Sequence, residues 1–116
     1  MSKVLYYTTK VGGNPVKKFI ESLQEKQQRK IIRILTQIQI YGLVTAIPHT
    51  KKLTGTSLWE IRILGKDNLR VLYVTVLDDS ILLLNGFSKK AEKTPLKEID
   101  VALLRLKDWL QIKNQH

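Results

Sequence analysis

Arg62 and Arg70 are the residues whose type and spacing first suggest chemistry. They lie on two predicted strands, and a three-residue loop at 65–67 would place Arg62 directly opposite Arg70. Two guanidinium groups this close repel each other unless an anion lies between them, and their planar donors match phosphate oxygens. The pair therefore indicates either a phosphate clamp or weak surface salt bridges, for which the available acids are Glu60, Asp67 and Asp78.

The next predicted strand can bring an aromatic side chain and a lysine to the same face. If Asp78-Asp79 forms a two-residue turn, Phe87 pairs opposite Arg70, and Lys89 lies on that face too. A slip of one residue in either register would separate these side chains. Phe87 would then be either a surface on which a nucleic-acid base stacks or a core residue at the end of its strand.

A small sheet and several helices must position these side chains. Runs rich in β-formers predict one early strand and three consecutive later ones, and a 3.6-residue period predicts three helices. The short connections between the later strands favour antiparallel pairing. We predict one α+β domain over residues 1–116, with an antiparallel sheet, helices packed on it and the order β-α-α-β-β-β-α. The expected strands are 4–9, 58–64, 69–77 and 80–88, the expected helices are 15–23, 25–41 and 95–112, and residues 43–57 are expected to be irregular.

The composition excludes several classes of site. The chain has no cysteine, which excludes a disulfide framework, a zinc–thiolate site and a cysteine nucleophile. No histidine pair or carboxylate cluster suggests a metal, and we expect no cofactor. The longest apolar run, residues 81–84, is far too short to span a bilayer, and residues 1–7 lack a signal-peptide pattern. We therefore expect a soluble, cytoplasmic protein.

The net charge of +10 favours a polyanionic partner, such as nucleic acid, an acidic protein or an anionic membrane surface. Residues 1–52 carry most of the excess, with ten basic and two acidic side chains. Part of it lies on the polar side of the predicted helix 25–41, and Lys51 and Lys52 continue it beside His49. The alternative is a merely solubilising surface, because net charge specifies neither a base sequence nor a reaction.

The segment from Lys51 to Arg62 resembles a family signature. It is similar to the lysine-leucine-glycine-leucine-tryptophan-glutamate-leucine-arginine pattern of RelE/ParE-superfamily toxins, and most closely to their phage-derived, HigB-like branch. The resemblance continues through Arg70–Tyr73 and Leu83–Lys90 and ends in Thr94-Pro95 and the following helix. It covers about residues 50–110, and the predicted early strand and helical pair agree with it in order.

The resemblance implies the toxin half of a type II toxin–antitoxin pair with a RelE-like fold. It implies a ribosome-dependent mRNA endoribonuclease, with a cognate antitoxin (expected to be a helix-turn-helix protein), the ribosome and mRNA as partners. The superfamily also contains gyrase-directed toxins of the ParE type, and a non-enzymatic nucleic-acid or protein-binding module is a further alternative. By motif match, the family's basic catalytic positions fall on Arg62, Arg70, Lys89 and Lys90. We expect RNA contacts from Phe87, Lys51, Lys52 and His49.

Metal-free RNA cleavage explains why such residues would be needed. The 2′-hydroxyl attacks the adjacent phosphate, which requires a base, a cation for the phosphorane and an acid for the leaving oxygen. Arg62 and Arg70 suit the charge-stabilising role because arginine keeps its proton. Lys89 or Lys90, with a pKa lowered by positive neighbours, could act as base or acid, and His49 is an alternative. No histidine or tyrosine stands clearly beside the 87–90 block, which is consistent with a site completed by the ribosome.

The predicted terminal helix is apolar on much of its circumference. Leu96, Ile99, Leu103, Leu106 and Leu110 form its main stripe, and Val101, Leu104 and Trp109 lie beyond it. Such a helix is usually buried on two sides. We expect that the sheet and the N-terminal helices cover it, or that one side remains open as a docking surface for the antitoxin.

Overall fold

A computed structural model of the chain describes residues 3–65, 68–77, 79–89 and 93–114. Five strands and three α-helices form, together with a 3-10 helix that follows α2. In chain order the elements are β1 (Val4–Tyr6), α1 (Pro15–Glu21), α2 (Glu25–Tyr41), η1 (Leu43–His49), β2 (Thr50–Lys52), β3 (Trp59–Ile63), β4 (Leu69–Val76), β5 (Ser80–Ser88) and α3 (Leu96–Asn114).

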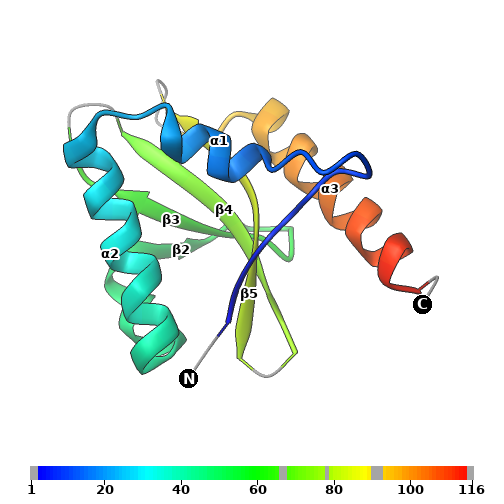
Figure 1. The fold of residues 1–116 in the computed structure, drawn as a ribbon, viewed down its shortest axis with the longest axis horizontal. Helices are drawn as coiled ribbons and strands as arrows, with labels where there is room; N and C mark the ends of the chain where they lie inside the picture. Colours follow the sequence, from blue (N-terminus) through cyan, green and yellow to red (C-terminus); the bar gives the residue numbers. More distant parts are fainter. Residues whose placement is uncertain (1–2, 66–67, 78, 90–92, 115–116) are drawn as a thin grey trace.

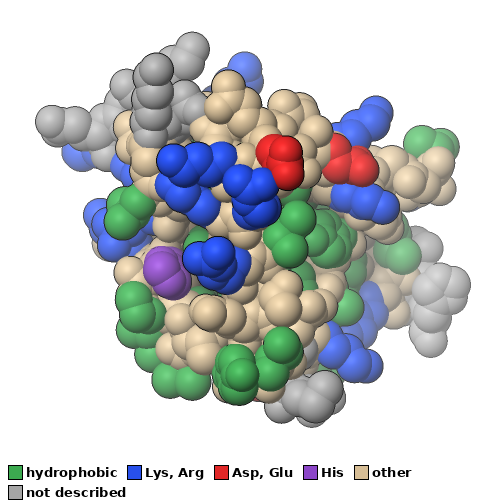
Figure 2. Space-filling view, turned by 60° about the vertical axis from the view of Figure 1, so that its left-hand side comes forward, with side chains coloured by type: hydrophobic (Ala, Val, Ile, Leu, Met, Phe, Trp, Pro, Cys, Tyr) green, Lys and Arg blue, Asp and Glu red, His purple; other side chains and the backbone are tan. Residues whose placement is uncertain are grey.

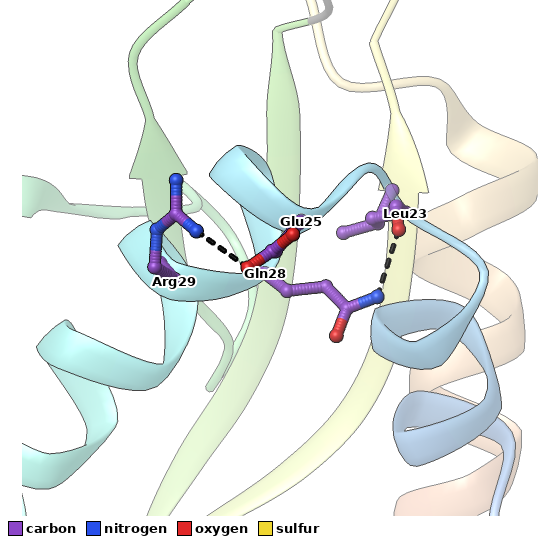
Figure 3. A network of polar contacts seen from close by, with 4 residues as sticks. All are labelled: Leu23, Glu25, Gln28 and Arg29. Carbon is purple, nitrogen blue, oxygen red and sulfur yellow. Dashed lines mark hydrogen bonds and ion pairs between the residues drawn. The ribbon is translucent and has the colours of Figure 1, made fainter.

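Local signals set the ends of the first two helices. The side chain of Asn14 accepts a hydrogen bond from the backbone N–H of Lys17, and Pro15 opens α1 at the residue where the helix was predicted to begin. At the start of α2, Arg29 pairs with Glu25 at 2.8 Å, and the Gln28 amide donates to the Leu23 carbonyl at 2.8 Å (Figure 3). Gly42, whose φ is 94°, ends α2 as predicted, because glycine adopts positive φ without strain.

The sheet is mixed, so the prediction of a purely antiparallel sheet is wrong. Its strand order is β1-β5-β4-β3-β2, and β1 lies parallel to β5. Short loops make the β3-β4-β5 meander antiparallel, and β2 also pairs antiparallel with β3. The first strand is joined to the rest through two helices, so its direction depends on long-range packing. The segment predicted to be irregular also forms η1 and the edge strand β2.

Helices cover both faces of the sheet (Figure 1). On one face α1 and α2 pack over a cluster that includes Ile61, Val71 and Leu83. On the other face α3 packs over Leu72, Leu82 and neighbouring buried residues. No helix in the described ranges is long and apolar enough to cross a membrane.

Arg70 pairs with Phe87 across β4 and β5, as predicted, but the connection between the two strands differs from the predicted turn. Val76 pairs with Ser80, so three residues connect the strands rather than two. A bulge beside Leu72 and Tyr73 then restores the register, and Arg70 pairs with Phe87.

Candidate functional site

A pocket of about 450 Å³ lies beside the N-terminal part of α3, at the β2–β3 side of the sheet. In the register of β2 and β3, Lys51 is paired with Glu60 and Lys52 with Trp59. Charged and polar side chains dominate the lining, which consists of Lys51, Lys52, Leu53, Thr54, Glu60, Lys89, Lys93, Thr94 and Ile99. Among the described residues, four lysines from three parts of the chain therefore surround one hollow: Lys51 and Lys52 on β2, Lys89 just after β5 and Lys93 just before α3.

Arg62 and Arg70 are direct cross-strand partners, as the loop length predicted. They share the face of the sheet that carries Glu60, because residues two apart on a strand point the same way. Arg62 is half-buried, and its Nε is buried with no hydrogen-bond partner among the residues that the structure describes.

Arg70 is held in place by a buried ion pair. Its Nε lies 3.3 Å from Oε1 of Glu60, and the two side chains are 10% and 2% exposed. Its Nη1 donates to the Leu69 carbonyl at 2.9 Å. The predicted alternative of a surface salt bridge to Glu60 is therefore right about the partner and wrong about the environment, because the pair is covered by the fold.

Glu60 links this arginine to the beginning of the terminal helix. One carboxylate oxygen faces Arg70, and the other accepts a hydrogen bond from the Thr94 hydroxyl, two residues before α3 begins. With 1% of its surface exposed, Glu60 cannot offer its charge to a ligand in the way that the lysines of the pocket can. Among the described residues the pocket is therefore cationic in effect, since the one glutamate in that part of its lining is already paired.

Polar contacts on the same face fix the position of α3. The Asn85 amide donates to the Glu98 carbonyl at 3.0 Å, and Arg105 donates to the Leu84 carbonyl at 2.8 Å. Burial lowers the pKa of Arg105 from its ordinary value. The Tyr7 hydroxyl donates to Asp108 at 2.5 Å, and this hydrogen bond, followed by burial, raises the pKa of Tyr7. These contacts hold the helix that forms one wall of the pocket.

The structure does not bring every predicted site residue to the pocket. Arg62 and Arg70 do not line it, although Arg70 is paired with Glu60, which does. Phe87 is only 5% exposed and packs in the cluster beneath α3, so its ring is a core element here and is not presented for stacking. His49 ends η1 and is half-buried, but it does not line the pocket. Lys90 lies outside the described residues, as do Asp67 and Asp78, whereas Lys89 lines the pocket.

Sequence reasoning missed three contributors to this site. Glu60 was considered only as one of several surface acids, although its strand parity already placed it with Arg62 and Arg70. Thr94 was noted only as part of the family resemblance, and Lys93 was not singled out. No local sequence pattern predicts the contact between Thr94 and Glu60, because the two residues are 34 positions apart.

A second basic surface lies on α2, across the sheet from this pocket. Lys26, Arg29 and Arg33 are exposed there, as the helical period predicted. The α2 side of the molecule is turned forward in Figure 2, where Lys and Arg side chains gather above a group of hydrophobic ones. No group of His, Cys, Asp or Glu in the described part of the chain could hold a metal ion.

A comparison with known proteins identifies a family to which this chain is similar. The model of the family described as phage derived protein Gp49-like (DUF891) matches residues 18–107, which include α2, the meander and most of α3. No curated protein matches the chain. The matched family belongs to the RelE/HigB-type toxin group, and its members are commonly toxins of toxin–antitoxin systems. With a match over most of its length and a cationic pocket built from the matched region, the chain belongs to the Gp49-like family of phage-derived proteins.

Proposed function

We propose that this chain is the toxin of a type II toxin–antitoxin pair, with a RelE-like fold of the HigB-like branch, and that it cleaves mRNA on the ribosome. The observation that carries the proposal is the pairing of Arg62 with Arg70 beside a pocket lined by four lysines. A toxin of this family also requires a cognate antitoxin, which we propose is a helix-turn-helix protein.

In this proposal the two arginines stabilise the negative charge on the phosphate during the reaction. The attack of the 2′-hydroxyl on phosphorus forms a 2′,3′-cyclic phosphate and releases a 5′-hydroxyl, and negative charge grows on the phosphorane in between. Arg62, which is half-buried rather than covered, donates from its guanidinium group to a phosphorane oxygen. Arg70 adds positive charge from the opposite strand, although Glu60 holds its Nε. Lys51 and Lys52 contact the neighbouring phosphates of the RNA.

The proton transfers are assigned to lysine. Lys89 is half-buried, lines the pocket and has cationic neighbours, and it acts as the base or the acid, with Lys90 as the second candidate from sequence. The phenylalanine predicted to stack and the histidine predicted to contact RNA take no part in this scheme. Because no histidine of the described residues lines the pocket, we propose that groups of the ribosome and the mRNA complete the reaction, so that free RNA is cleaved slowly.

The decisive test compares two arginines of different surroundings. Arg62→Ala removes a charge from the arginine pair on β3 and β4, and Arg33→Ala removes the same charge from the exposed face of α2. Each variant is induced in growing cells, and mRNA ends are mapped on translating ribosomes together with the rates of protein and DNA synthesis. We expect the native chain and Arg33→Ala to cut mRNA and to stop protein synthesis first, and Arg62→Ala to cut at least 100-fold less, because one lost oxyanion donor costs about two to three powers of ten.

Three results would count against this proposal. Equal cutting by Arg62→Ala and the native chain would remove the pocket from the mechanism. An early stop of DNA synthesis with intact mRNA would identify a gyrase-directed toxin. Normal growth after induction would indicate that the chain is a non-enzymatic binding module rather than a toxin.

A further inference from the structure

The outer side of α3 carries leucines that the fold leaves uncovered. Ile99, Ala102, Leu106 and Trp109 pack toward the sheet, whereas Leu96 is 76% exposed and Leu110 is 46% exposed. The predicted stripe of five residues is therefore divided: Ile99 and Leu106 pack against the sheet, and Leu96, Leu103 and Leu110 remain exposed. The N-terminal helices pack on the opposite face of the sheet, so they do not cover this side of α3 either (Figure 1).

The three exposed members form a straight ridge. Leu96, Leu103 and Leu110 are spaced by seven residues, so they follow one line along the helix. The ridge spans about 21 Å, the rise of fourteen helical residues. We refer to these three residues as the leucine ridge. An exposed apolar line of this length on a helix is typical of a helix-docking surface.

The leucine ridge adjoins the cationic pocket. Ile99 lies on the flank of α3 next to Leu96 and Leu103, three and four residues away, and it also lines the pocket. A segment that lies along the ridge would therefore have one of its sides over Lys51, Lys89 and the other pocket lysines.

Charge selects among the possible occupants. Lys97 and Lys107 are exposed on the solvent side of α3, where Asp100 is the exposed acid. The pocket adds four lysines, and the whole chain carries +10. A second copy would set +10 against +10 and lysines against lysines, which disfavours self-association through this surface. An acidic partner has no such penalty.

We propose that the leucine ridge and the cationic pocket together bind one amphipathic helix of the antitoxin, with apolar residues on the ridge and Asp or Glu over the pocket lysines. Because the same lysines are assigned to RNA, the bound helix excludes mRNA. This inference rests on the proposed toxin function, from which it takes the existence of an antitoxin.

A pair of matched double variants tests the ridge. Leu103→Glu with Leu110→Glu places two acids on the ridge, and Ile32→Glu with Ile40→Glu places two acids on α2, where both isoleucines are about half exposed. Each full-length chain is co-expressed with the antitoxin encoded beside it, and the dissociation constant of the purified pair is measured by calorimetry. We expect at least a tenfold weaker complex for the ridge variant and less than a threefold change for the α2 variant.

The absence of cysteine from the chain allows a second measurement that does not depend on the acidic variants folding. Leu103→Cys and Ile32→Cys are each labelled with a thiol reagent, with and without the antitoxin. We expect the antitoxin to slow labelling at position 103 at least tenfold and to leave position 32 unchanged. Equal labelling rates at position 103, equal affinities of the ridge variant and the native chain, or no complex at all would overturn the inference.

The outcomes separate this inference from the proposed function. If the ridge variant escapes the antitoxin but neither it nor the native chain cuts mRNA, the docking surface stands and the ribonuclease assignment fails. If the native chain cuts mRNA and the antitoxin binds with the same affinity to both double variants, the ribonuclease stands and the docking surface fails. If RNA slows labelling at position 103 to the same extent as the antitoxin, the leucine ridge belongs to RNA binding instead.

Discussion

Replacement of Arg70 by alanine is expected to damage the fold as well as the site. The change removes the cation that lies 3.3 Å from Glu60 and leaves the Glu60 carboxylate almost fully buried without its partner. Removing one member of a buried ion pair typically costs about 3–5 kcal/mol of unfolding free energy. A domain of this size has about 5–15 kcal/mol in total, so the variant would lose a large part of its stability.

Urea unfolding measures this loss, with the fluorescence of Trp59 and Trp109 and far-ultraviolet circular dichroism as two independent probes. Arg33→Ala is the matched control, because the same residue type is exposed there and its loss should cost under about 0.5 kcal/mol. The double variant Arg70→Met with Glu60→Gln removes both charges and keeps the volume. We expect it to recover at least half of the loss, since the unpaired carboxylate is gone.

Two results would refute this reasoning. A loss below about 1 kcal/mol for Arg70→Ala would mean that the pair contributes no more than a surface salt bridge. A double variant no more stable than Arg70→Ala would mean that the cost does not come from the unpaired Glu60 carboxylate. If the prediction is confirmed, loss of toxicity in Arg70→Ala cannot be assigned to catalysis alone, and Arg62 is the cleaner probe.

Three further predictions concern the scaffold. Gly86→Ala should cost about 1–3 kcal/mol in urea unfolding, because a Cβ at this position would overlap the ring of Phe19 in α1; stability like that of the native chain would contradict the close packing. Asn14→Ala should cost about 1 kcal/mol through the lost N-cap of α1, whereas Asn14→Ser should cost little. The free energy of unfolding should fall as the pH rises above about 10, because Tyr7, together with Tyr6 and Tyr73, keeps its proton in the fold beyond the pH at which it is lost from the unfolded chain. Tyr7→Phe should flatten that decline, and an unchanged slope would show that Tyr7 does not cause it.

The sequence by itself determined the features that depend on neighbouring residues. Asn14 and Gly42 mark helix ends through their own backbone chemistry, so these boundaries were predictable. The short loop between β3 and β4 leaves one favoured register, and for that reason the pairing of Arg62 with Arg70 could be predicted.

The tertiary structure decided what depends on distant parts of the chain. The parallel pairing of β1 with β5 joins residues almost eighty positions apart, and no local pattern encodes its direction. The turn between β4 and β5 is one residue longer than predicted, and the bulge in β5 shifts the register back by one residue, so that Phe87 faces Arg70. Strand alternation in the sequence reveals neither change.

The burial of side chains shows most clearly the difference between what the sequence predicts and what the tertiary structure decides. Periodicity predicts which side chains share a face, but it does not predict how much of that face other elements cover. Glu60 and Arg70 became a buried pair because α3 begins beside them, and the leucine ridge stayed open because α1 and α2 pack on the other side of the sheet. Coverage is a property of the assembled layers, and only the folded chain determines it.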